Sequence, residues 1–235
     1  MHRTSRLTAH AFVVTALSLS SALFAACHPS ATTDTPAASS GATASATVTA
    51  TVAKTTVGTD PGHAGAGTPL APSPGHALAA FAEGCFWGSE NTFRHVPGVV
   101  ATAVGYTGGT TSNPTYESVC SHTTRHAETV LIEFDPKVVS YKSLVGVFFR
   151  SHDPTTKNRQ GPDFGDQYRS AIFFVSPDQE ADARAAMADA QKAQSKPIVT
   201  EITALGAFWK AEAYHQQYDE KTGRESCPLP QVLGI

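Results

Sequence analysis

The chain has 235 residues, a formal charge of −3 at pH 7 from 17 basic and 20 acidic side chains, and 41% hydrophobic residues. This length suits one ordinary domain with a sizeable core and some appendages. No long basic run occurs, so nucleic acid and anionic membrane surfaces are excluded as main partners. The four cysteines, Cys27, Cys85, Cys120 and Cys227, form no CxxC pair, which argues against a zinc site of paired ligands.

The first 27 residues have the pattern of a secretory signal. Arg3 and Arg6 precede an apolar run over 7–24, which is too rich in Ser and Thr to predict a spanning helix. The ending FAAC (24–27) resembles a bacterial lipobox, in which Cys27 would be lipidated and become the mature N-terminus. Several acyl chains on one cysteine would anchor the protein stably. Plain secretion with cleavage near the small residues is the alternative. Either way we expect an exported protein, periplasmic or in the cell envelope.

Residues 28–76 consist mainly of Ala, Thr, Ser, Gly and Pro, and carry charges only at Asp34, Lys54 and Asp60. Such a segment buries too little apolar surface to offset its ordering entropy. We therefore predict a disordered tether over 28–76 between the membrane and a folded domain at 77–235. A secreted N-terminus without an anchor would show the same disorder.

Strand and helix patterns alternate along the domain. Strands are expected at 77–82, 99–106, 128–134, 171–175 and 198–205, and helices at 88–95, 141–152, 177–195 and 211–219. Ser176-Pro177-Asp178-Gln179 is a strong helix start, because Ser176 can cap, Pro177 suits the first turn and Gln179 can complete a capping box. The alternation predicts an α/β (α+β) fold, a two-layer sandwich with a mixed β-sheet packed by helices, ferredoxin-like.

The stretch GCFWG at 84–88 places Cys85 between a strand and a helix. A helix N-terminus favours the thiolate, because its unpaired N–H groups stabilise negative charge. Gly84 and Gly88 allow close backbone approach and unusual dihedral angles. Phe86 and Trp87 could form an apolar pocket beside the sulfur. A buried structural cysteine flanked by ordinary core aromatics is the alternative.

Several polar loops carry further motifs. They are GYTGG (105–109), NPTYESVCS (113–121), RHAETV (125–130), HDP (152–154) and QGPDFGDQYRSAI (160–172). Together with GCFWG, these pieces closely resemble the peptide methionine sulfoxide reductase A family over nearly all of residues 77–220.

The resemblance implies an enzyme, a peptide-methionine (S)-S-oxide reductase, with Cys85 as the nucleophile that attacks the sulfoxide sulfur. Phe86 and Trp87 would hold the substrate methyl group, which suits an apolar aromatic slot. Glu128 would protonate the sulfoxide oxygen, and such an acid needs a pKa raised by an enclosed site. A solvated acid at a strand edge is the alternative for Glu128.

Three more residues are implied to bind the substrate. Tyr116 and Tyr168 match the tyrosines that hydrogen-bond the sulfoxide oxygen, where their hydroxyls would stabilise developing charge. Asp163 matches an acid that organises the site. Packing would be the alternative role of either tyrosine, and loop capping that of Asp163.

Recycling is implied to use a second cysteine. A sulfenic acid on Cys85 would condense with a thiol to a disulfide, and Cys227 lies in a C-terminal tail as the family's resolving cysteine does. The surrounding Glu225-Ser226-Cys227-Pro228 departs from the usual glycine- and aromatic-rich neighbourhood. With one distal cysteine, a second relay disulfide from the tail is excluded. An external dithiol protein, thioredoxin-like, would be the reductant, with no bound cofactor and a monomeric enzyme.

The segment before Glu128 leaves other possibilities open. Cys120 suits a small buried filler or a substitute resolving thiol. His122 and His126 near Cys120 invite a metal site, but no fourth ligand has suitable spacing. Arg125 stands where the family commonly has glycine. Two other functions compete with the reductase: a thiol peroxidase or sulfenic-acid sensor using Cys85, and a non-catalytic module that binds oxidised proteins. Neither needs both a proton donor and a resolving cysteine.

Overall fold

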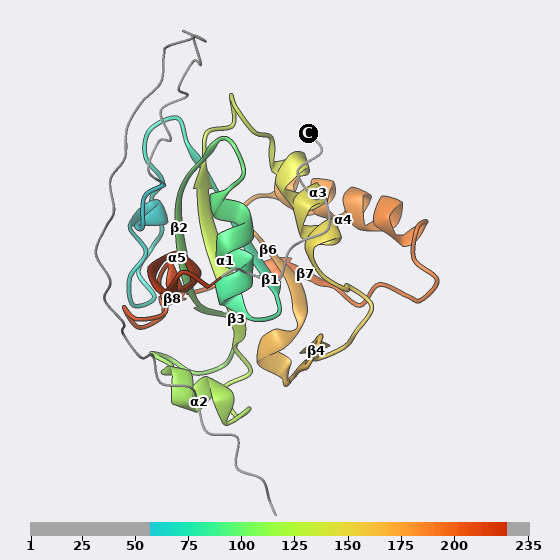
Figure 1. Ribbon diagram of the computed structural model, residues 1–235. Coiled ribbons are helices and arrows are strands. Elements are labelled where there is room, and N and C mark those ends of the chain that lie inside the picture. Colours follow the sequence, from blue (N-terminus) through green and yellow to red (C-terminus); the bar gives the residue numbers. More distant parts are fainter. Residues whose placement is uncertain (1–56, 225–235) are drawn as a thin grey trace, which may run out of the picture. The chain divides into compact units, whose positions relative to one another are not determined.

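The computed structural model describes residues 57–224, so the predicted signal peptide, Cys27 and Cys227 lie outside the described residues. A six-stranded sheet has the order β7-β6-β1-β3-β2-β8 (Figure 1). Its strands are β1 (Ala77–Glu83), β2 (Val99–Thr107), β3 (Ala127–Phe134), β6 (Ser170–Phe174), β7 (Glu201–Ala204) and β8 (Trp209–Lys210). Only β6 and β7 pair in parallel, and the other named pairs of this sheet are antiparallel.

The helices are α1 (Phe86–Arg94), α2 (Tyr116–Cys120), α3 (Tyr141–Ser151), α4 (Pro177–Gln191) and α5 (Tyr218–Thr222). A small hairpin of β4 (Arg159–Gln160) and β5 (Asp163–Phe164) and two 3-10 turns, Pro61–His63 and Asp166–Tyr168, complete the elements. No helix within residues 57–224 is long and apolar enough to cross a membrane.

The central strands define the fold class. Helix α1 connects β1 to β2, and α3 connects β3 to β6, while β1 lies between β6 and β3 in the sheet. This βαββαβ order, with antiparallel neighbours in the centre, is ferredoxin-like. The predicted mixed sheet packed by helices is confirmed.

The two faces of the sheet are covered differently. One face packs against α1, α3 and α4, and Phe81 of β1 stacks there on Phe93 and Phe148 at centroid distances of 5.2 and 5.4 Å. Because side chains alternate along a strand, Ala80 and Leu131 point to the other face. Irregular segments around 64–70 and 205–208 cover that face.

Two expectations about local structure need correction. Ser176 does cap α4 by accepting from Gln179 N–H at 3.3 Å, but Gln179 accepts from Val175 N–H instead of completing a capping box. The helix expected over 211–219 is absent, and α5 begins only at Tyr218. Residues 211–217 instead direct their hydrogen bonds at β2 and α1: the Gln216 amide pairs with both N–H and C=O of Val104.

Residues 57–76 differ from the predicted tether, because in the structure they lie along the domain. Gly58 bridges to Ala101 of β2. The carboxylate of Glu133, only 4% exposed, accepts from Gly62 N–H at 2.7 Å, Ser73 N–H at 2.9 Å and His76 Nδ1 at 2.9 Å. Composition predicts little apolar burial for this segment, yet Ala64 and Leu70 pack on the sheet, and hydrogen bonds to the buried Glu133 carboxylate hold the segment as well.

Substitution of Glu133 tests this anchoring. Burial alone would raise the Glu133 pKa, but the bonds from Gly62, His76 and Ser73 outweigh it and hold the pKa below its usual range. The charged form is therefore favoured in the fold, and its contribution is lost as pH falls through the lowered pKa. We expect Glu133→Gln to lower the free energy of unfolding by about 2–4 kcal/mol at pH 7, since an amide cannot accept all three bonds.

Urea unfolding at pH 7 and at pH 3 measures this effect. The difference between wild type and Glu133→Gln should shrink at pH 3. Glu180→Gln, which alters an exposed pair with Arg184 on α4, is the matched control and should change stability by less than about 1 kcal/mol. Equal effects of the two substitutions would contradict an anchoring role for Glu133.

Candidate active site

The nucleophile candidate lies at the junction of β1 and α1. Cys85 is the N-cap residue of α1, with φ −57° and ψ 121°, and is partly exposed. Gly84 before it has φ +107°, and a Cβ there would lie 2.7 Å from the Gln160 side chain, so this position requires glycine. Gly88 has no atom within 4 Å of an added Cβ. The close approach expected at Gly88 is therefore wrong.

The environment of Cys85 favours the thiol and not the thiolate. Burial raises its pKa most, and Glu128 and Asp163 add to this, whereas backbone hydrogen bonds from Trp87 and Gly88 lower the pKa by less. The result is a pKa of about 12. The helix N-terminus thus acts in the expected direction but is outweighed, and Cys85 is protonated at neutral pH.

Glu128 lies in β3, beside Tyr106 of β2 in the sheet register. The residue is 2% exposed, and its Oε2 accepts from Phe86 N–H, the first residue of α1, at 3.1 Å. Burial raises the Glu128 pKa to about 8, and Asp163 adds to the rise. The group is a neutral carboxylic acid at pH 7. The alternative of a solvated edge acid is excluded by this burial.

The remaining predicted polar residues come to the same place. Burial is the main reason that the pKa of Tyr168 is raised. The nearby groups Glu128, Asp163 and Cys85 raise it further. Burial likewise raises the pKa of Tyr116, with contributions from Glu128 and Tyr168. Loops far apart in the sequence therefore bring two carboxyl groups and two phenols around one thiol.

The aromatic pair after Cys85 divides between core and surface. Phe86 is 1% exposed and packs with Val104, Tyr106, Val119 and Ala211. Trp87 is half-buried at the edge of this cluster. The two residues that follow Cys85 therefore place one ring inside the core and the other at its edge.

His215 is a residue of this site that the sequence analysis missed. It is 1% exposed, its ring lies 5.0 Å from Phe86 and 4.6 Å from Tyr116, and its Nδ1 accepts from Trp87 Nε1 at 3.0 Å. Burial lowers its pKa, so the ring stays neutral and can accept. Three of the four aromatic residues predicted to bind substrate, Phe86, Trp87 and Tyr116, therefore contact one imidazole. The expected helix over 211–219 gave no reason to single it out.

Glu212 is a second residue that the sequence did not reveal. Its carboxylate accepts from the Tyr106 hydroxyl at 3.0 Å and from Tyr116 N–H at 2.9 Å. It thereby ties the start of α2, which carries Tyr116, to β2. Thr115 completes that start as a capping box with Ser118.

The loop before Glu128 has defined hydrogen bonds. His122 pairs with Gln167 at 2.9 Å, and the His126 nitrogens contact Gly109 N–H and Thr111 C=O. Within residues 57–224, no three His, Cys, Asp or Glu side chains gather as a metal site would require. Arg125 has φ +59°, so an arginine adopts the left-handed conformation that glycine favours.

Cys120 interacts with two residues of the candidate site, Tyr116 and Glu128. Burial raises the pKa of Cys120 most, the hydrogen bond from the Tyr116 hydroxyl lowers it, and Glu128 adds to the rise. Cys120 is partly exposed. Its part in recycling stays a prediction.

Comparison with known proteins gives the class to which this fold and site belong. The family model for peptide methionine sulfoxide reductase matches residues 77–232. The chain is 53% identical over 160 residues to peptide methionine sulfoxide reductase MsrA of Methanoculleus marisnigri, covering 67% of this chain and 98% of the relative. It is 58% identical over 160 residues to MsrA of Methanosarcina acetivorans, covering 66% and 85%.

Solved structures agree with the sequence relatives. Methionine sulfoxide reductase A of Corynebacterium diphtheriae superposes with a TM-score of 0.62 at 37% identity, covering 74% of this chain and 90% of the other. Mxr1 of Saccharomyces cerevisiae in reduced form gives 0.63 at 35% identity, covering 67% and 92%. The chain therefore belongs to the peptide methionine sulfoxide reductase family. The predicted family and enzyme class, peptide-methionine (S)-S-oxide reductase, are confirmed.

The contacts of His215 lead to a prediction about substrate binding. His215→Phe keeps a ring in the cluster but removes the acceptor for Trp87 Nε1. We expect KM for methionine sulfoxide to rise about tenfold, the cost of one unmade hydrogen bond, with a smaller change in kcat. His215→Gln, which can still accept, should recover part of the loss. Steady-state kinetics measure this, and an unchanged KM in His215→Phe would contradict it.

Proposed function

We propose that this chain reduces the S epimer of methionine sulfoxide, free or within exported proteins, to methionine by thiol chemistry. The observation that carries the proposal is the buried, neutral carboxylic acid of Glu128 beside the Cys85 thiol. A sulfoxide oxygen leaves poorly unless it gains a proton, and an acid that stays protonated near neutral pH can supply one. Membership of the reductase family supports the same reaction.

The proposed first step can be written for these residues. The substrate methyl group rests against Phe86 and Trp87, while the sulfoxide oxygen faces Glu128 and the hydroxyls of Tyr116 and Tyr168. Cys85 Sγ attacks the sulfoxide sulfur as Glu128 protonates the oxygen. In the balanced step a thiol and a sulfoxide become a sulfenic acid and a thioether. Cys85 is oxidised by two electrons, and methionine is the reduced product.

The protonated thiol is compatible with this step. Once Glu128 has given its proton to the sulfoxide oxygen, it is a buried carboxylate close to Cys85. A carboxylate in that place favours uptake of a proton, as its raised pKa shows. The thiol proton can therefore return to Glu128, and the site needs no resting thiolate. Asp163, beside both groups, would favour the proton on Glu128.

Recycling is proposed to use Cys227 and a thioredoxin-like dithiol protein, with no bound cofactor. Cys227 follows the last described residue, Arg224, by three positions. The Arg224 guanidinium carbon lies 6.0 Å from the centroid of the Trp87 ring. The Arg224 side chain therefore lies near the aromatic residue that follows Cys85 by two positions, and Cys227 is at most about 10 Å of chain further on. Cys227 would attack the sulfenic acid to give a disulfide and water.

Export and anchoring through Cys27 belong to the same proposal. The signal-like N-terminus and the FAAC ending support it, and oxidised exported proteins would be the substrates. We propose a monomer whose contact with the membrane is the lipid on Cys27. Mass spectrometry of the mature N-terminus would distinguish an acylated Cys27 from plain cleavage, and an unmodified N-terminus beyond Cys27 would exclude the anchor.

Separate epimers of a blocked methionine sulfoxide test the activity. We expect turnover of the S epimer alone, with dithiothreitol as reductant, and loss of turnover in Cys85→Ser by at least about 10³-fold because no nucleophile remains. Glu180→Gln, which alters an exposed pair on α4, is the control and should keep the activity. Turnover of neither epimer by a folded protein would contradict the proposal and make peroxide the next substrate to test.

The proton donor predicts the pH dependence. The Glu128 pKa is raised to about 8, so the acid is present below about pH 8 and is lost above it. The rate of methionine formation in a single turnover should fall as pH rises through about 8. Glu128→Gln should slow the step about 10²-fold or more and remove this fall. A fall that persists unchanged in Glu128→Gln would assign the titration to another group.

A further inference from the structure

One face of α1 holds the C-terminal segment of the described chain. Trp87, Glu90 and Arg94, spaced i, i+3 and i+7, lie along the same side of the helix. We call these three residues the docking face. Each of them contacts a different part of segment 215–224, and the docking face begins two residues after Cys85.

The first contact lies at Trp87. Its ring stacks on Tyr218 with a centroid distance of 3.8 Å and an angle of 11°, while its Nε1 donates to His215. The start of α5 is therefore held against the ring of Trp87, two residues after Cys85. Arg224 beyond α5 also lies over this ring.

The second contact is made by Glu90, which is 1% exposed. Its carboxylate accepts from Gln217 N–H at 2.7 Å, from Gln217 Nε2 at 2.8 Å and from Thr102 Oγ1 at 2.9 Å. Gln217 has φ +50°, a left-handed conformation that a glutamine rarely adopts. The Glu90 carboxylate thus holds the N-cap residue of α5 in a strained conformation that turns the chain into the helix.

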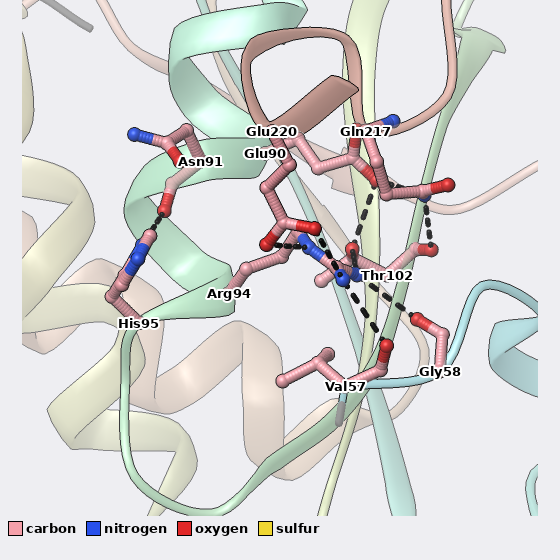
Figure 2. Close-up of polar contacts among 9 residues, drawn as sticks. All are labelled: Val57, Gly58, Glu90, Asn91, Arg94, His95, Thr102, Gln217 and Glu220. Carbon is pink, nitrogen blue, oxygen red and sulfur yellow. Dashed lines mark hydrogen bonds and ion pairs between the residues drawn. The ribbon is translucent and has the colours of Figure 1, made fainter. Parts of the chain in front are cut away.

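The third contact is the fork between Arg94 and Glu220 of α5. Arg94 Nε and Nη2 donate to the two carboxylate oxygens at 2.9 and 3.0 Å, and its remaining donors reach Val57 C=O, Gly58 C=O and Thr102 Oγ1. Figure 2 shows these contacts converging between α1, β2 and α5. The guanidinium side chain is 5% exposed, so its geometry is fixed from several sides.

Helix α1, which begins directly after Cys85, therefore holds the segment that leads into the C-terminal tail. Helix α5 ends at Thr222, Gly223 follows with φ +64°, and Cys227 is four residues further on. We propose that Glu90 and Arg94 are positioning residues for the resolving step, because they hold the start of the tail against α1, the helix that begins directly after Cys85. The inference rests on the proposed role of Cys227 as the resolving thiol.

The step concerned is the second one of the cycle. The Cys227 sulfur bonds to the Cys85 sulfur, the bond from Cys85 to its hydroxyl oxygen breaks, and water leaves with the Cys227 proton. Neither Glu90 nor Arg94 contacts the sulfoxide in the proposed first step. Weaker contacts at Glu90 and Arg94, with Trp87 itself unchanged, should therefore slow disulfide formation and leave methionine formation nearly unchanged.

Glu220→Ala is the variant that tests this, since Glu220 is 41% exposed and Arg94 keeps its bonds to Val57 C=O, Gly58 C=O and Thr102 Oγ1. Reduced protein is mixed with the S epimer of blocked methionine sulfoxide, without reductant. Methionine, free thiols and sulfenic acid trapped by a 1,3-dione are followed in time. We expect methionine formation within twofold of wild type and disulfide formation slowed about fivefold, the range of one partly exposed ion pair.

Two further variants sharpen the test. Gln217→Gly relieves the left-handed strain but removes the side-chain bond to Glu90, and should also slow disulfide formation. Glu180→Ala removes an exposed pair with Arg184 on α4 and should change neither step. Unchanged or faster disulfide formation in both Glu220→Ala and Gln217→Gly would overturn the proposal, as would an equal slowing of methionine formation.

The wild-type protein separates this inference from the proposed function. If it releases no methionine, the reductase proposal fails. If it releases methionine but loses only one thiol, or if Cys227→Ser still forms the disulfide, the role of Cys227 fails and the positioning role falls with it. If the wild type loses two thiols per methionine and both docking variants match its rates, the positioning role alone is wrong.

Discussion

The site depends on the burial of one carboxyl group, Glu128, against the first turn of α1. Side chains alternate along β3, so Glu128 shares the face of Val130 and Ile132, which is the face covered by helices. Its Oε2 meets Phe86 N–H, which ties the acid to the element that carries Cys85. Burial makes the acid neutral near pH 7. The same burial favours the neutral thiol, so both reacting groups of the proposed first step are protonated in the resting site.

The ferredoxin-like order explains how distant residues share this place. Strand β1 delivers Cys85 at its end, and β3, its antiparallel neighbour, delivers Glu128 at its start. Strands β1 and β3 run in opposite directions, so the end of β1 lies beside the start of β3. Cys85 and Glu128 therefore lie at the same end of the central strands. Tyr116 at the start of α2 and Tyr168 in a 3-10 turn lie in the connections beside this end of the strands, where a rigid sheet can position binding groups.

The sequence predicted most of this from local patterns. Short apolar runs predicted the strands. The motif GCFWG and the motifs of the polar loops predicted a site around Cys85 and Glu128. It failed where contacts between distant residues decide the structure. The thiolate expected at a helix N-terminus is outweighed by burial beside Glu128, and burial is not visible in a short motif. His215 was missed for the same reason: its partners Trp87 and Tyr116 are about a hundred or more residues away in the chain.

The segment after β8 shows why a helical pattern can mislead. Residues 211–217 have the periodicity of a helix, but Glu212, His215 and Gln216 each hydrogen-bond or pack against β2, α1 or α2. Those tertiary bonds replace the intrahelical ones. The result is an irregular segment whose side chains line the aromatic cluster and whose end is held on the docking face. One stretch of chain thus supports the substrate side of the site and leads into the tail that carries Cys227, which links the first step of the proposed cycle to the second.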